Sequence, residues 1–301
     1  MNATVSISPA LLDTIQHTLG GIFATKYLSG SAVTLALWDH LCTSGREIET
    51  IWSRRLDLTK AIYLLNRWGV GMGLIYAAYV ISGFRQNDQT TWVLLCEGFS
   101  VVILTLASAS SLFTNVYMVF YYYGLWERSK VTMTILTSAL ILCYVPAYTL
   151  LVLTIIRYRE NTIYYPRFNA CVVVEQQSVA KGFWGCLAAF DIAALSIGVL
   201  SSFGRPYRQS ADVLQSLRRD GAIWFTSLFL LRLLNLVIAI TIPSTELLIT
   251  ILISWALINA TACQFVLRVE GLKIRKVPPV RVWNVQTDGF ELGRWSSNGV
   301  R

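Results

Sequence analysis

Two charged residues inside long apolar stretches are the clearest candidates for chemistry in this 301-residue chain. Asp191 lies in the apolar run 182–203, and Arg232 lies in the run 221–242. A charge in hydrocarbon is costly, so such residues normally pair or face a cavity. Both lie near the middle of their runs, and consecutive helices are usually neighbours. We predict a buried ion pair, which acts either as a static lock between helices or as a ligand, proton or switch site.

Three asparagines in apolar runs form a second group of candidates. Asn235 follows Arg232 by three residues and shares its helical face. Asn66 and Asn259 lie in the runs 62–83 and 245–267. We expect Asn66, Asn235 and Asn259 to form an intramembrane polar cluster, with Asn259 bonded to another helix.

Four polar residues lie toward the ends of the first two runs. Asp39 and His40 end the first run, and Asn66 and Arg67 lie about one turn into the second. They either meet as an inner polar cluster or extend to water at the membrane edge. For Arg67 and His40 the sequence favours extension to water.

The cysteines and sequons suggest two modifications. Six cysteines without CxxC or Cys/His ligand spacing support neither a disulfide framework nor a zinc site. Cys96 and Cys171 fall on the predicted exterior side, so a disulfide between them is one candidate and free thiols are the other. Asn2 begins an Asn-Ala-Thr sequon and is a candidate glycosylation site.

Several kinds of enzyme and pump lack their motifs. The chain has two histidines and no HExxH, GxSxG or Walker A sequence. The last apolar run has no central lysine for a retinal Schiff base. We therefore expect no cofactor, no metal and no enzymatic activity.

Seven helices must position these residues. The chain is 54% hydrophobic and only 14% charged, with a mean hydropathy of +0.53, and a soluble domain would carry about a quarter charged residues. Seven runs approach or exceed the roughly 20 residues that cross hydrocarbon as a helix. They predict an all-α, integral membrane seven-helix bundle over 22–41, 62–83, 96–124, 131–156, 182–203, 221–242 and 245–267.

The basic residues predict the orientation of this bundle. Of the residues in the connections and tails, seventeen Lys and Arg fall on one side and five on the other. This places the N-terminus outside and the C-terminus in the cytosol. The net charge of +8 thus marks membrane orientation, and we expect the lipid bilayer, with no nucleic acid, as partner.

Two tails and one aromatic group complete the layout. Residues 1–21 are expected as an exterior N-tail, and 268–301 as a cytosolic tail that is basic and then largely disordered. Tyr121, Tyr122 and Tyr123 are expected to anchor the inner end of the third run in the headgroups. The residues expected to hold anionic lipid next to the membrane are Arg268, Lys273, Arg275 and Lys276.

Several stretches resemble a fungal (basidiomycete) family of multi-pass membrane proteins that carries an N-terminal domain of unknown function. The most specific stretches are Lys26 to His40, Arg46 to Trp52, and Leu64 to Arg67. Weaker likeness extends to Tyr123–Lys130 and Arg219–Gly221. The resemblance implies multi-pass topology and brings no established activity.

The sequence therefore predicts a membrane protein of unknown biochemical function. A receptor-like seven-helix sensor with a cytosolic signalling partner is the favoured concrete role, on the basis of helix number and orientation. A small-molecule transporter or channel and a non-enzymatic membrane scaffold are the alternatives. The residues indicate neither a ligand nor the choice between plasma membrane and endomembrane.

Overall fold

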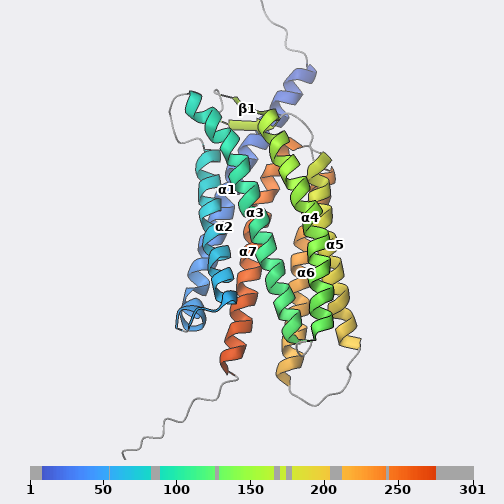
Figure 1. The fold of residues 1–301 in the computed structure, drawn as a ribbon. Coiled ribbons are helices and arrows are strands. Elements are labelled where there is room, and N and C mark those ends of the chain that lie inside the picture. Colours follow the sequence, from blue (N-terminus) through green and yellow to red (C-terminus); the bar gives the residue numbers. More distant parts are fainter. Residues whose placement is uncertain are drawn as a thin grey trace, which may run out of the picture.

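Within the residues that the structure describes, the fold is a bundle of seven α-helices with one π-helical turn and one short hairpin (Figure 1). The computed structural model describes residues 9–53, 55–82, 89–125, 129–165, 170–173, 178–203, 212–241 and 244–275. The elements are α1 (Pro9–Glu47), η1 (Ile48–Trp52), α2 (Leu58–Ser82), α3 (Gln89–Leu125), α4 (Lys130–Asn161), β1 (Thr162–Tyr165), β2 (Ala170–Val173), α5 (Ser178–Phe203), α6 (Asp212–Thr241) and α7 (Ser244–Arg275).

The helices run side by side along the bundle and alternate in direction, so α1 begins and α7 ends at opposite ends (Figure 1). Strands β1 and β2 pair antiparallel, with Tyr164 opposite Cys171, and β1 packs against α3. The turn η1 lies at the end of the bundle where α7 finishes, and it contacts α7. Helix α7 packs against α1, α2, α3 and α6, and 72% of its most apolar window is buried. It is therefore the helix around which the first half of the chain is arranged.

Six of the described helices, α2 to α7, are long and apolar enough to cross a membrane. The all-α membrane architecture follows from these six. Helix α1 is 39 residues long but does not meet this criterion, because polar residues such as Lys26 and Asp39 interrupt its apolar stretch. The crossing of the membrane by α1 stays a prediction.

The helix boundaries differ from those predicted at both ends of the chain. Helix α1 begins at Pro9 and ends at Glu47, whereas the apolar run spans 22–41. Helix α7 continues to Arg275, eight residues beyond the predicted end at 267. Residues 9–21 and 268–275, which fall in the predicted tails, are thus helical. Hydropathy identifies only the apolar part of a helix. The backbone hydrogen bonds of the helix continue into the polar sequence beyond that part.

The tyrosines at the end of α3 correct a second expectation. Tyr121 and Tyr122 are buried, with ring centroids 5.3 and 5.1 Å from that of Phe225 on α6. Tyr121 also lies 5.0 Å from Phe265 of α7. These rings fill the bundle interior, where Tyr121 packs edge to face and Tyr122 packs tilted against Phe225, and do not anchor in headgroups. Tyr123 is half-buried.

Candidate intramembrane polar site

Asp191 of α5 and Arg232 of α6 meet inside the bundle. Arg232 Nη1 lies 2.6 Å from Asp191 Oδ1, and the side chains are 1% and 2% exposed, respectively. The sequence placed both residues near the middle of adjacent helices, and the helices pack directly against each other. The ion pair lets each charge compensate for the hydration that the other loses.

Three further residues extend this pair to α3 and α4. Arg232 Nη1 donates to Asn115 Oδ1 at 2.8 Å, and Asn115 Nδ2 donates to the Tyr144 hydroxyl at 2.7 Å. The Tyr144 hydroxyl also lies 3.2 Å from Ser111 Oγ. We call Ser111, Asn115, Tyr144, Asp191 and Arg232 the central network. Sequence reasoning missed Asn115, although a single amide in the apolar run 96–124 is a signal of the same kind as Asn259.

The central network has polar atoms without partners. Asp191 Oδ2 and Arg232 Nη2 are buried and form no hydrogen bond with any described residue. The same holds for Asn235 Oδ1, one turn along α6. Buried polar atoms are normally bonded, so this gap calls for an explanation.

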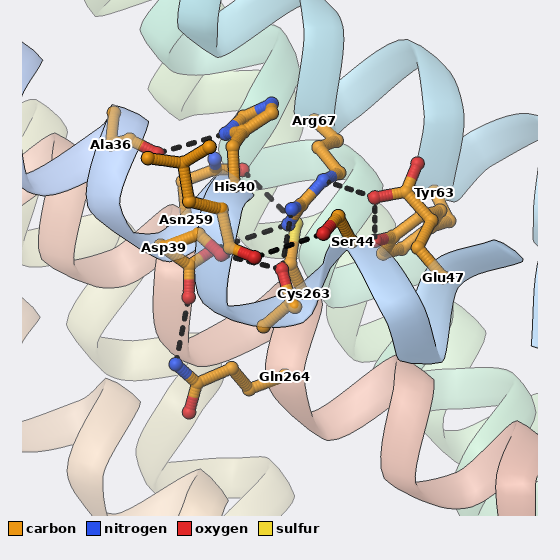
Figure 2. A network of polar contacts seen from close by, with 12 residues as sticks. Ala36, Asp39, His40, Ser44, Glu47, Tyr63, Arg67, Asn259, Cys263 and Gln264 are labelled. Atoms are coloured by element: carbon orange, nitrogen blue, oxygen red, sulfur yellow. Dashed lines mark hydrogen bonds and ion pairs between the residues drawn. The ribbon is translucent and has the colours of Figure 1, made fainter.

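A second network surrounds Arg67 where α1 ends and α2 begins (Figure 2). Arg67 is 1% exposed; its Nη1 lies 3.1 Å from Asp39 Oδ2 and its Nε lies 2.7 Å from Glu47 Oε2. Its Nη2 donates to the Thr43 hydroxyl. The expectation that Arg67 extends to water is therefore wrong. Two carboxylates and a hydroxyl at bonding distance stabilise the guanidinium inside the bundle.

Every carboxylate oxygen in this second network accepts a hydrogen bond. Gln264 of α7 donates to Asp39 Oδ1 at 2.7 Å, opposite the Arg67 contact. Glu47 Oε1 accepts from the Trp52 indole and Oε2 from the Tyr63 hydroxyl, both at 3.2 Å. We call Asp39, Thr43, Glu47, Trp52, Tyr63, Arg67 and Gln264 the Arg67 network. It joins α1, η1, α2 and α7.

A simple sequence spacing builds the Arg67 network. Asp39, Thr43 and Glu47 follow one another at intervals of four, which puts them on one face of α1. Tyr63 and Arg67 repeat this interval on α2. The signal was present in the sequence, but only the contact between the two faces makes it a network.

The predicted asparagine cluster forms in part. Asn66 Nδ2 donates to Asn259 Oδ1 at 3.1 Å, so the expected bond from Asn259 to another helix is present. The Cys263 thiol lies 3.6 Å from the same oxygen. Asn235 is bonded to neither asparagine among the described contacts, because its position on α6 places it beside Arg232.

His40 is half-buried and does not join the carboxylates. Its Nδ1 lies 2.9 Å from the Ala36 carbonyl oxygen, one turn back on α1. Its ring packs edge-on against Trp68, with centroids 5.5 Å apart. His40 is thus a local contact of α1 with α2.

The remaining predicted sites fall mostly outside the described side chains. Cys96 lies in α3 and Cys171 in β2, but neither side chain is described, so their disulfide stays a prediction. Asn2 and Lys276 lie outside the described residues. Arg268 is exposed on α7, and Lys273 and Arg275 continue that helix. The basic segment is therefore helical as far as Arg275.

The described side chains contain no group of three His, Cys, Asp or Glu that could hold a metal ion. No curated protein and no solved structure matches the chain. The stretch that contains Asp39, Glu47 and Arg67 does match a family model, and the family's description indicates no biochemical activity. Residues 27–71 are similar to a family of unknown function (DUF6533).

Proposed function

We propose that this protein is a non-enzymatic, receptor-like membrane sensor whose responsive element is the central network. In this proposal seven helices cross the membrane, the N-terminus lies outside, and the C-terminus meets a signalling partner in the cytosol. The proposal names neither a ligand nor the cellular membrane that houses the protein.

The observation that carries the proposal is the difference between the two networks. The Arg67 network satisfies every carboxylate oxygen of Asp39 and Glu47, as expected of a fixed lock. The central network leaves Asp191 Oδ2 and Arg232 Nη2 without described partners. An incomplete buried pair gains more from a proton, a water molecule or a ligand than a complete one does. Such a gain can bias one arrangement of the helices over another.

The position of the central network supports the same role. Its members come from α3, α4, α5 and α6, so a change at Arg232 acts on four helices at once. The Arg67 network joins α1, α2 and α7 on the other side of the bundle. In this proposal the Arg67 network fixes α1, α2 and α7, whereas α3 to α6 are joined by an ion pair whose bonding can change.

Two observations support the proposed topology, one for the number of crossings and one for the orientation. Helix α1 packs along both α2 and α7, each of which is apolar enough to span the bilayer. The excess of Lys and Arg in the connections on one side supports a cytosolic C-terminus.

The test measures whether the bundle has two arrangements that the central pair controls. Spin labels are attached to cysteines that replace Leu58 on α2 and Ile223 on α6, both exposed, in a variant in which all six native cysteines have been replaced. We expect two distance populations in lipid nanodiscs, with a clear change in their ratio on Asp191→Asn.

The matched control is Asp39→Asn, which removes a buried carboxylate from the Arg67 network, whose carboxylate oxygens all accept hydrogen bonds. It should lower stability and leave the ratio of populations unchanged. A single distance population that Asp191→Asn does not alter would refute the sensor and favour a scaffold. Solute flux through reconstituted vesicles that Asp191→Asn abolishes would instead favour a transporter or channel.

A further inference from the structure

The end of α1 and the turn η1 carry an exposed stripe of large apolar side chains. Trp38, Leu41, Ile48 and Trp52 are between 56 and 72% exposed. They follow one another at intervals of three, seven and four residues, which places side chains on one face of a helix. The stripe begins in the first apolar run of the sequence and continues beyond the end of that run.

The turn η1 holds the end of this stripe against the bundle. The Ser53 N–H donates to the Ile48 carbonyl oxygen at 3.1 Å, five residues back, which is the wide turn of a π-helix. The Trp52 indole donates to Glu47 Oε1 at 3.2 Å, although more than half of the Trp52 side chain is exposed. Ile51, beside it, is buried. The turn therefore packs on the bundle with one face and directs Ile48 and Trp52 outward with another.

The exposed apolar surface continues onto α2. Leu56 and Leu58 are both 67% exposed, and Leu65 and Trp68 follow on α2 at helical spacing and are also exposed. Helix α2 is apolar enough to span a membrane, so its exposed apolar face is a lipid-facing surface. We call Ile48, Trp52, Leu56 and Leu58 the connecting stripe, because they join the exposed stripe of α1 to that of α2. Water at these side chains is unfavourable, and lipid already covers the surface they continue.

The charges of this segment lie on a separate face. Arg46, Glu49 and Ser53 are exposed and follow one another at intervals of three and four. In the sequence, residues 46–57 contain three arginines and three acidic residues, so their formal charge is zero. Attraction to anionic lipid requires an excess of basic residues. Apolar contact is therefore the interaction that this segment offers to a membrane.

We infer that the connecting stripe is a membrane-surface anchor, inserted at the boundary between headgroups and acyl chains. Tryptophan is favoured at this depth, and an apolar helix face enters the same boundary while its polar face remains in water. The continuity with the exposed face of α2 favours lipid over a protein as the partner. The anchor does not depend on the sensor role, because it requires only that α2 spans the bilayer.

The experiment measures the surroundings of single side chains in the full-length protein. Single cysteines replace Ile48 or Leu56, which are exposed and lie outside the Arg67 network, in a variant without the native cysteines. The matched controls carry the cysteine at Arg46 or Glu49, on the polar face. A nitroxide is attached to each, and the protein is placed in nanodiscs of phosphatidylcholine. Electron paramagnetic resonance then reports collisions with oxygen, which dissolves in lipid, and with a nickel complex, which stays in water.

We expect the ratio of oxygen to nickel collisions to be several-fold higher at Ile48 and Leu56 than at Arg46 and Glu49. Equal ratios at all four positions would overturn the inference. Few collisions with either reagent at Ile48 and Leu56 would show that protein, such as a second copy of the chain, covers the stripe, and would also refute it. Nanodiscs with added phosphatidylserine should give the same ratios. A high ratio that appears only with this anionic lipid would contradict anchoring by apolar contact.

Discussion

At the scale of single residues, the decisive feature is how few charges enter the bundle and how each is held. Arg67 has oxygen atoms of Asp39, Thr43 and Glu47 within bonding distance, so no face of its guanidinium is left to water. Arginine suits this role because its planar fork presents donors in several directions at once. From the sequence alone, Arg67 is only a basic residue near the end of an apolar run.

Arg67→Met should be strongly destabilising, because it leaves Asp39 and Glu47 buried without their cation. Loss of one partner of a buried pair typically costs about 3–5 kcal/mol. Thermal unfolding of the purified protein in detergent measures the effect. The control Arg46→Ala, on the exposed face of α1, should change stability by about 0.5 kcal/mol or less. A triple variant with Asp39→Asn, Glu47→Gln and Arg67→Met should recover part of the loss, and no recovery would contradict the charge argument.

Asp191 and Arg232 allow a charge-swap test of the central pair. Asp191→Arg combined with Arg232→Asp should express better than either single variant, because each single variant buries two like charges. Fluorescence-detected size-exclusion chromatography of tagged protein reports the folded yield. Equal yields of all three variants would contradict direct pairing.

At the scale of elements, α7 completes the unit formed by the segment similar to the unknown-function family. Residues 27–71 cover the second half of α1, all of η1 and the first half of α2. Gln264 of α7 donates a hydrogen bond to Asp39 of this segment, and Asn66 donates one to Asn259 of α7. The segment is therefore one side of an interface whose other side lies nearly two hundred residues later.

The close approach of α2 to α7 depends on Gly73. A Cβ atom there would lie 2.7 Å from Trp255 Cη2 and 3.1 Å from Leu106 Cδ1. Gly73→Ala should therefore destabilise the bundle by about 1–3 kcal/mol, as overpacking does. Gly69→Ala is the matched control, because nothing lies within 4 Å of its added Cβ. Equal thermal stability of the two variants would show that α2 and α7 are not in this register.

At the scale of the whole molecule, the open matter is how many times the chain crosses the bilayer. Six helices qualify by length and apolar content, and α1 packs on two of them. An odd number of crossings puts the chain ends on opposite sides of the membrane, and an even number puts them on one side.

We predict that the two ends lie on opposite sides. A small epitope tag at each end, probed with antibody before and after permeabilisation, measures this directly. The N-terminal tag should be accessible on intact cells, or protected inside vesicles if the protein resides in an endomembrane. The C-terminal tag should show the opposite accessibility. Both tags on one face would mean that α1 lies along the bundle without spanning the bilayer.

Part of the candidate site could be predicted from the sequence. Asp191 and Arg232 stood out because charges in apolar runs are rare, and the depth of each in its run placed them opposite each other. Asn66 and Asn259 stood out because amides in apolar runs are also rare, and the two side chains form a hydrogen bond. Arg67 was misread because a residue near the end of an apolar run can reach water or turn inward, and hydropathy does not distinguish the two.

The sequence by itself determined the all-α membrane class, the positions of the apolar helices and the rarity of buried charge, because these follow from local composition and the thickness of hydrocarbon. Only the tertiary structure decided that Arg67 is enclosed, that Tyr121 and Tyr122 fill the interior, and that Asn115 joins Arg232. These contacts depend on which faces of distant helices meet. Helix rotation and packing are set by side chains that fit across the whole bundle, and no local pattern encodes that fit.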